Sequence, residues 1–326
     1  METRMTTPTT PHTLNLNWNT VSPDTFLLGE SPFWHPQEQT LYWVDIPGKK
    51  VCRANVYMGT VDSWDLPSEP GCIAPATGGG LVIARRDGVF RAPEWRGELE
   101  LITTLPYDTG HVRANDGKCD ALGRLWVGTI DESKAHLAGA LYSIDCRSGG
   151  APLVQQHAGN ALTGNGLGWS PDGCTTYWAD TPNHIVHAWD FDVQANALQV
   201  HRVFLQLPPK PTNWQWDAPR DSNGLPTYRG RPDGAAVDVE GNYYCAMFEG
   251  QRICKFAPDG QLLAEIPVPA MCPTMPCLGG EDGKTLYVTT ARYNRSADEL
   301  AAFPLSGSVF STRVEVPGLP VHVFVG

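Results

Sequence analysis

The chain has 326 residues, and its 35 acidic residues outnumber its 24 lysines and arginines, which gives a formal net charge of −11 at pH 7. Such a balance argues against a nucleic-acid partner or an anionic membrane surface, because both require a basic face, and it favours small neutral or cationic molecules. The hydrophobic fraction of 41% is sufficient for a large core. By length the chain is either two domains or one large all-β domain.

The N-terminal segment and the cysteines favour a cytoplasmic protein. Residues 1–12 are rich in threonine and proline and contain no apolar signal-peptide core, so we expect a disordered tail over residues 1–13. No apolar run is long enough to cross a bilayer. Most of the nine cysteines, such as Cys119, Cys174 and Cys245, lie in apolar runs and show no zinc-binding spacing. We therefore expect buried free thiols in a reducing compartment.

A short apolar strand pattern recurs six times along the chain. The copies start about 40–50 residues apart, apart from one longer gap, and that interval is close to one blade of a β-propeller. They cover residues 41–44, 81–84, 125–128, 176–179, 243–246 and 286–289. No convincing amphipathic helix lies between them, which counts against an α/β fold. The pattern predicts an all-β, six-bladed β-propeller as a single domain over residues 14–326; a β-sandwich with a chance period is the alternative.

The repeat also predicts how the blades are built. We expect the apolar copies to be the innermost strands, because neighbouring blades cover both of their faces. Ring closure usually needs a blade built from both termini, so residues 13–18 are expected to join the last blade, residues 309–325.

The longer gap contains an insertion over about residues 207–230 that is rich in proline and carries Trp214 and Trp216. Long loops of this kind in compact domains are usually functional lids or disordered. The two tryptophans favour an ordered, lid-like segment that shields the channel mouth. Alternatively, they only pin the loop to the propeller.

Four turn-like segments carry a glycine beside an oxygen-bearing side chain: Glu30, Asn115, Asn165 and Asp233. Each precedes a strand pattern by a similar distance, so a propeller would bring the four side chains to one rim of the channel. Hard oxygen ligands without a cluster of lysine or arginine suit a divalent cation. Two carboxylates and a carboxamide would leave positions open for water and substrate, as a catalytic site requires. The alternative is four unrelated turn residues.

Several motifs resemble those of the regucalcin (senescence marker protein) and gluconolactonase family. They are residues 29–34, 113–118, 165–170 and 232–234, and they follow one another in the family's order from about Gly29 to the last blade. The resemblance implies a six-bladed propeller that hydrolyses sugar lactones. No Gly-x-Ser-x-Gly motif is present, so a serine nucleophile is not supported.

The resemblance also implies roles for individual residues. Those matching the family's metal ligands are Glu30, Asn165 and Asp233, and those matching its substrate contacts are Arg113 and Asn115. Asp233 additionally matches the residue proposed as general base in that family.

The third blade departs from the family pattern. After Gly128-Thr129 the family often has a methionine and a downstream glutamate that contacts substrate, whereas this chain reads Ile130-Asp131-Glu132. We take Glu132 as the candidate substrate contact, with Asp131 as the other possibility.

These observations predict a metal-dependent hydrolase that opens an aldonolactone, such as glucono-, xylono- or arabinonolactone. The metal would be one divalent ion, and oxygen ligands admit Ca, Zn, Mn, Mg or Fe(II). A propeller esterase or organophosphatase and a non-enzymatic metal-binding propeller remain as alternatives. We expect the partner to be a small-molecule sugar lactone and the protein to be a monomer or a weak homo-oligomer.

Overall fold

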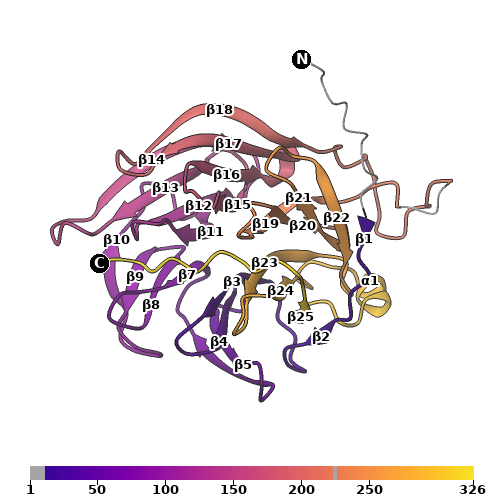
Figure 1. Ribbon diagram of the computed structural model, residues 1–326, viewed down its shortest axis with the longest axis horizontal. Helices are drawn as coiled ribbons and strands as arrows, with labels where there is room; N and C mark the ends of the chain where they lie inside the picture. The colour runs from indigo at the N-terminus through magenta and orange to yellow at the C-terminus, as the bar shows by residue number, and fades with distance from the viewer. Residues whose placement is uncertain (1–11, 223–225) are drawn as a thin grey trace.

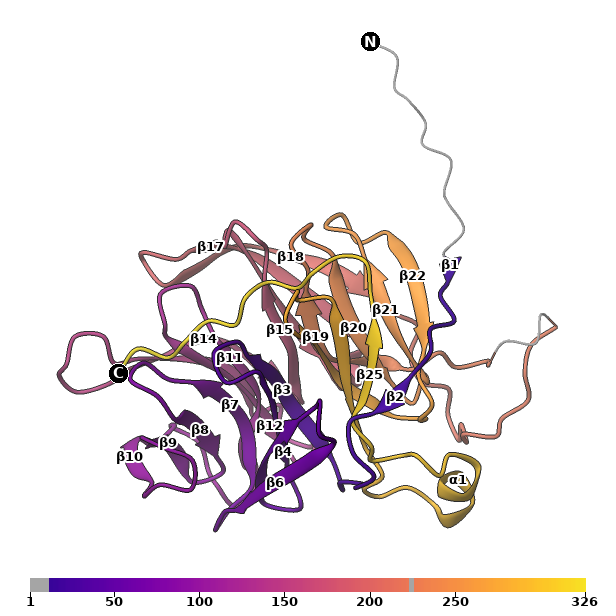
Figure 2. The same cartoon turned by 60° about the horizontal axis from the view of Figure 1, so that its bottom comes forward.

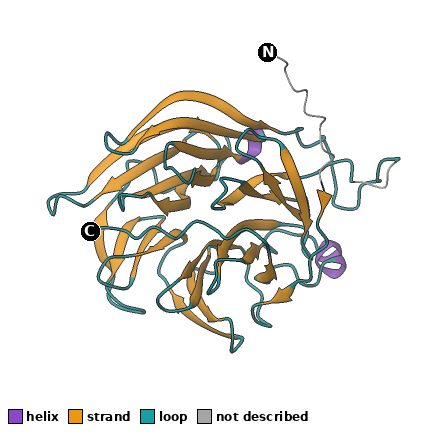
Figure 3. Cartoon of the chain, in the orientation of Figure 1, coloured by secondary structure: helices purple, strands orange, loops and turns teal. Residues whose placement is uncertain are grey.

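Six antiparallel sheets of short strands stand around a common axis in the computed structural model of the protein (Figure 1). The structure describes residues 12–222 and 226–326. In this part of the chain the only helices are α1 (Ala297–Ala302) and the single 3₁₀ turn η1 (Thr181–Asn183), and strands make up the rest of the regular structure (Figure 3). The predicted six-bladed β-propeller is confirmed.

Each blade is a meander whose strands follow one another outwards from the channel. The innermost strands are β3 (Gly29–His35), β7 (Pro70–Pro75), β11 (Val112–Cys119), β15 (Gly164–Trp169), β19 (Arg231–Val237) and β23 (Pro273–Gly279). The second strands are β4 (Thr40–Asp45), β8 (Leu81–Arg85), β12 (Leu125–Asp131), β16 (Thr175–Asp180), β20 (Tyr243–Phe248) and β24 (Thr285–Thr290). The third strands are β5 (Lys50–Asn55), β9 (Gly88–Ala92), β13 (Gly139–Asp145), β17 (Ile185–Asp192), β21 (Arg252–Phe256) and β25 (Phe310–Arg313). The outer strands are β6 (Thr60–Asp65), β10 (Glu100–Thr103), β14 (Leu153–Ala161), β18 (Ala197–Gln206), β22 (Leu262–Pro267) and, in the sixth blade, β2 (Asn19–Thr20).

The apolar repeat forms the second strand of each blade, so its expected innermost position was wrong. Trp43, Trp126 and Trp178 on these second strands are 0–2% exposed because they lie between the sheets of adjacent blades. The polar, glycine-containing segments that precede the repeat are themselves the innermost strands. Their glycines permit a close approach: a Cβ at Gly117 would lie 2.4 Å from both the Cys72 Sγ and the Trp126 carbonyl oxygen.

The sixth blade is closed by the N-terminal segment, but not by the residues expected. Asn19 and Thr20 of β2 pair with Ser311 and Phe310 of β25. The preceding residues run across the seam between the fifth and sixth blades, where Trp18 packs on Phe310 and donates to the Pro267 carbonyl. Residues 12–13 form β1 (His12–Thr13), which adds parallel to β22 in the fifth blade. The remainder of the expected tail lies outside the described residues.

The last thirteen residues do not form blade strands as expected but cross one face of the ring (Figures 1 and 2). After β25 the chain passes over the fifth blade, where the Leu319 amide donates to the Val237 carbonyl at 3.2 Å. It ends on the second blade, where Phe324 pairs with Ala76 and its side chain is fully buried. The C-terminal segment therefore bridges the ring from one side to the other.

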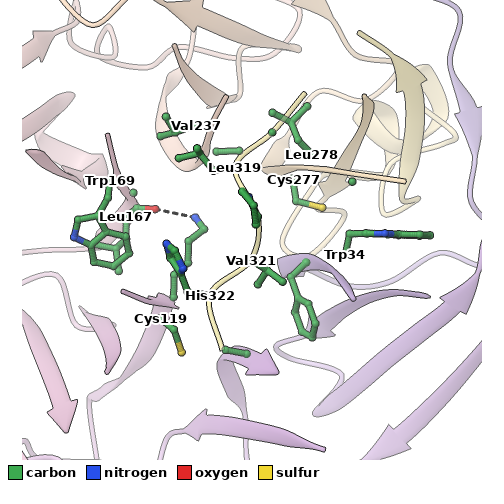
Figure 4. A pocket seen from close by; sticks show the side chains of 18 of the residues that line it. Trp34, Cys119, Leu167, Trp169, Val237, Cys277, Leu278, Leu319, Val321 and His322 are labelled. Atoms are coloured by element: carbon green, nitrogen blue, oxygen red, sulfur yellow. Dashed lines mark hydrogen bonds between the residues drawn. The ribbon is translucent and has the colours of Figure 1, made fainter. Parts of the chain in front are cut away.

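Beneath this segment lies a cavity of about 500 Å³ at the end of the channel where the innermost strands finish. Figure 4 shows Trp34, Trp169, Leu319, Val321 and His322 around it. Its lining is predominantly apolar, and the residues predicted from the sequence to hold metal and substrate lie near the opposite ends of these strands.

Seven of the nine cysteines are buried and all nine are free thiols. Cys174, which was expected to be buried, is exposed in the turn before β16, because the strand begins one residue later and its apolar residues begin at Tyr177. No helix in the described residues is long and apolar enough to cross a membrane.

The C-terminal bridge gives a stability prediction. Replacing the fully buried Phe324 by alanine should lower the free energy of unfolding by about 3–5 kcal/mol, because it leaves a cavity in the core of the second and third blades. Val323→Ala is the matched control, since that side chain is 39% exposed, and it should change stability by about 0.5 kcal/mol or less. Urea denaturation measures both. Equal effects of the two substitutions would show that the bridge does not anchor the ring.

Candidate metal and substrate site

The residues expected in turns lie near the beginning of innermost strands, where each strand is irregular. In β3, β11, β15 and β19 the register with the next strand shifts within the segment that contains Glu30, Asn115, Asn165 or Asp233. A bulge of this kind bends a strand and redirects its side chains. All four side chains are buried, with exposures between 3% and 7%.

Three blades are connected by a chain of side-chain hydrogen bonds at this end of the channel. Asn115 Nδ2 donates to Asn165 Oδ1 at 2.7 Å, and Asn165 Nδ2 donates to Asp233 Oδ1 at 2.6 Å. The guanidinium of Arg113 donates to Asn115 Oδ1 at 3.0 Å. Four of the residues predicted from the sequence, contributed by β11, β15 and β19, therefore meet in one buried network.

Glu30 joins this group through charge rather than a hydrogen bond. Burial raises the pKa of Glu30 well above its ordinary value, and the carboxylates of Asp233 and Asp116 raise it further. Burial likewise raises the pKa of Asp233 to about 8, although the nearby Arg231 opposes the shift. These carboxylates are close enough to repel one another in a desolvated space, where a cation would stabilise their charged forms.

Asp116 and Lys118 also belong to this site, although the sequence analysis gave them no role. Asp116 Oδ2 accepts from the Leu167 amide at 2.9 Å, whereas Asp116 Oδ1 is buried without a hydrogen-bond partner. Lys118 Nζ donates to the carbonyls of Leu167 and Ala235 and supplies the positive charge nearest to Glu30 and Asp116. Both residues lie within three positions of Asn115, so their place in the Asn-Asp-Gly-Lys segment was the available signal.

The side chains present suit a hard divalent cation. Glu30 and Asp233 provide carboxylate oxygens, and the orphaned Asp116 oxygen indicates that the site has unsatisfied acceptor capacity. No three His, Cys, Asp or Glu residues of the described chain converge as a metal-binding set, so the Asn165 carboxamide would have to contribute. In this structure Asn165 turns its nitrogen toward Asp233, so its oxygen would face a shared cation only after the carboxamide rotates.

Arg113 is held in place by a charged pair with Glu132. Arg113 Nε donates to Glu132 Oε1 at 3.0 Å, and the other oxygen of Glu132 accepts from Arg86 at 2.7 Å. Asp131, the other candidate acid, accepts from the amides of Ser133 and His136 and so stabilises the turn after β12. Of the two acids, Glu132 is therefore the one that contacts a residue of the candidate site, and its partners are Arg113 and Arg86.

Residues 28–292 match the family model described as the SMP-30/Gluconolactonase/LRE-like region. The chain belongs to this SMP-30/gluconolactonase family. A 6-deoxy-6-sulfogluconolactonase from Pseudomonas putida is 40% identical over 303 residues, which cover 92% of this chain and 96% of that relative. Regucalcin from Danio rerio is 30% identical over 303 residues, covering 92% and 95% of the two chains. The resemblance inferred from the motifs is therefore confirmed.

A solved structure of a family member agrees with the fold. The crystal structure of a calcium-binding protein, regucalcin, from Agrobacterium tumefaciens has a TM-score of 0.85 at 25% identity, and the match covers 97% of this chain and 99% of that one. The fold is thus shared over nearly the whole length of both chains.

The tryptophans of the insertion are packed against the propeller. The ring of Trp214 lies 5.0 Å from that of Tyr228, and the ring of Trp216 lies 6.1 Å from that of Phe303. Both border a small buried group that includes Met271 and Cys272. This packing supports the pinning alternative, while a role as a lid over substrate stays a prediction; residues 223–225 of the insertion lie outside the described chain.

The raised pKa values of the buried carboxylates predict how the stability of the protein depends on pH. Burial raises the pKa of Asp233 from 3.8 to about 8. A raised folded-state pKa contributes stability that is complete below the unfolded value and is lost as the pH rises through the folded value. We therefore expect the melting temperature of chelator-treated protein to fall between about pH 4 and pH 8, and a divalent cation to restore it at the upper end.

Asp233→Asn provides the matched comparison, because it keeps the shape of the side chain but does not ionise. Its melting temperature in chelator should fall less over the same range, with Glu30 accounting for what remains. If the wild-type protein shows no fall in chelator, the carboxylates do not repel one another as the geometry indicates.

Proposed function

We propose that this chain is a metal-dependent hydrolase that opens a sugar lactone to the aldonic acid. The observation that carries the proposal is the buried network in which Asp233, Asn165 and Asn115 are hydrogen-bonded in sequence beside the carboxylate of Glu30. Family membership supports lactone hydrolysis, because the relative from Pseudomonas putida is named a sulfogluconolactonase. Glucono-, xylono- and arabinonolactone are the simplest substrates for testing.

Glu30, Asn165 and Asp233 are the proposed metal ligands. Their oxygens suit Ca, Mg, Mn, Zn or Fe(II), and calcium is the ion that the Agrobacterium regucalcin is described as binding. A bound divalent cation would polarise a lactone carbonyl and lower the pKa of a water molecule, which together supply several kcal/mol of transition-state stabilisation.

The chain's own residues would perform the remaining tasks. Asp233 is the proposed general base, because a carboxylate within hydrogen-bond reach of the attacking water can accept its proton. Arg113 and Asn115 would hydrogen-bond the carbonyl and hydroxyl oxygens of the lactone. Glu132 would keep the Arg113 guanidinium oriented, since it accepts from Nε while Nη1 donates to Asn115.

Two other functions use the same fold. A propeller esterase or organophosphatase would share the metal and the base but take a less polar substrate. A non-enzymatic platform would need none of these side chains, and a buried polar network of this extent is costly unless it has a use. The hydroxyl-rich sugar lactone suits the amide and guanidinium donors better than an aryl ester does.

Acid release from a panel of lactones, an aryl ester and an organophosphate, followed by base titration, tests the proposal. We expect lactone hydrolysis that disappears in chelator and returns with one of the candidate cations. Glu30→Gln keeps the side-chain volume but removes a charge, so it should weaken metal binding while the fold persists. Activity that is indifferent to chelator, or full metal binding by Glu30→Gln, would contradict the proposed metal site.

Asp233→Asn tests the proposed base. The substitution keeps one oxygen but removes basicity, so turnover at saturating metal should fall about 10²–10⁴-fold. Asp65→Asn is the control, because the Asp65 side chain is 83% exposed on the outer strand of the first blade, and it should leave turnover unchanged. Metal binding must be measured alongside. Near wild-type turnover of Asp233→Asn at saturating metal would place the base elsewhere.

A further inference from the structure

Three cationic side chains converge on one buried carboxylate beside the candidate metal site. Lys210 Nζ lies 2.9 and 2.8 Å from the two carboxylate oxygens of Glu249. Arg231 and Arg295 each place a guanidinium nitrogen 3.1 Å from the same carboxylate. We call Lys210, Arg231, Arg295, Glu249 and Glu299 the Glu249 cluster, because Glu299 completes it by pairing with Arg295.

The Glu249 cluster carries one positive charge in excess, since three cations face two carboxylates. The carboxylates are deeply buried, with side-chain exposures of 4% for Glu249 and 2% for Glu299. The cationic side chains remain accessible, at 32% for Lys210, 22% for Arg231 and 15% for Arg295. The carboxylates are therefore the more deeply buried partners of these ion pairs, and the cations are the more accessible ones.

A cavity of about 290 Å³ opens on this cluster. It lies between the insertion, which contributes Lys210, Trp214 and Trp216, and the segment before α1, which contributes Asn294 and Arg295. The Lys210 ammonium is 4.9 Å from the centre of the Trp214 ring, which helps to fix it at the cavity wall.

The two cations on the cavity wall have donors to spare. Lys210 has three N–H groups, and its side-chain bonds to described residues all go to Glu249. Arg295 uses three of its five N–H groups in its bonds to Glu249 and Glu299. An oxyanion in the cavity could therefore be bound without breaking the pairs beneath it.

The cluster adjoins the proposed catalytic residues. Arg231 is the first residue of β19, two positions before Asp233, and it acts on the Asp233 carboxylate electrostatically. The insertion, the turn that holds Glu249 and the segment before α1 all lie at the end of the propeller where β19 begins. The cluster that borders the cavity therefore extends to Asp233 through Arg231.

We propose that the Glu249 cluster is a subsite for a sulfonate or phosphate group carried by the lactone, at the far end of the sugar from the reacting carbonyl. This rests on the proposed function, which it narrows to lactones with an anionic substituent. Arginine and lysine donors bind such oxyanions through charge-assisted hydrogen bonds. A singly charged sulfonate would balance the one excess positive charge, whereas a phosphate dianion would exceed it.

The test compares kcat/KM for D-glucono-lactone, its 6-phospho derivative and its 6-deoxy-6-sulfo derivative. Lys210→Gln should reduce kcat/KM for an anionic lactone about tenfold to a hundredfold, which is the usual effect of losing a hydrogen bond to a charged group. It should change kcat/KM for the neutral lactone by less than about threefold. The anionic lactone whose kcat/KM falls more in Lys210→Gln identifies the group that the subsite binds. Lys210→Arg should restore most of the lost kcat/KM, because it restores the positive charge.

Lys50→Gln is the matched control, because it removes the same charge from an exposed pair with Asp65 in the first blade. It should leave the ratio between anionic and neutral lactones unchanged. Equal losses on neutral and anionic lactones in Lys210→Gln, or no loss on either, would overturn the proposal while leaving lactone hydrolysis intact. If Lys210→Gln does not fold, as judged by its melting curve, Arg295→Gln takes its place in the same comparison.

Calorimetric binding of 6-phosphogluconate to the metal-loaded protein separates this proposal from the proposed function. If no lactone is hydrolysed, the proposed function fails, yet binding that weakens at least about tenfold in Lys210→Gln still supports the anion subsite. Absence of binding at millimolar 6-phosphogluconate, together with no preference for either anionic lactone, would overturn the subsite.

Discussion

The structure depends on a concentration of carboxylates at one end of a narrow, desolvated channel. The beginnings of β3, β11 and β19 bring Glu30, Asp116 and Asp233 close enough to affect one another's charge. Such an arrangement destabilises the folded protein whenever the carboxylates are ionised without a compensating cation. Lys118 compensates in part, but it is itself buried, and burial lowers its pKa. The rest of the propeller must therefore be stable enough to offset the repulsion between these buried carboxylates.

The stability of the propeller comes from packing between the blades, away from the carboxylates. Second strands fill the space between blades with large side chains, such as Trp43 and Trp126, which are fully buried. The ring is closed once by β2, and the C-terminal segment spans the opposite end of the channel, anchored by Phe324. The C-terminal segment does not enter the carboxylate end, which is left to the insertion, the loops between strands and the residues that lead into β3.

The repeat was sufficient to predict the fold, because a period of one blade is a property of the whole chain and tolerates local errors. It could not assign strand order within a blade, since apolarity marks burial between sheets and not distance from the axis. The site residues Glu30, Asn165 and Asp233 were recognisable because glycine-flanked motifs surround each of them. The ends of the chain were harder, because residues 14–18 and 314–326 pack by individual contacts that no periodic pattern encodes.

The Glu249 cluster was invisible to sequence reasoning for a different reason. Lys210, Arg231 and Arg295 come from three separate places in the chain, and an overall charge of −11 pointed toward neutral or cationic ligands. Net charge governs long-range attraction, but salt screens such attraction beyond about 8–10 Å, so a binding pocket responds to the charges that line it. An acidic protein can therefore attract few anions to its surface as a whole and still hold one in a cavity where Lys210 and Arg295 have donors to spare. The acidic surface would then slow the approach of an anionic substrate, while affinity would be set by Lys210 and Arg295 on the cavity wall.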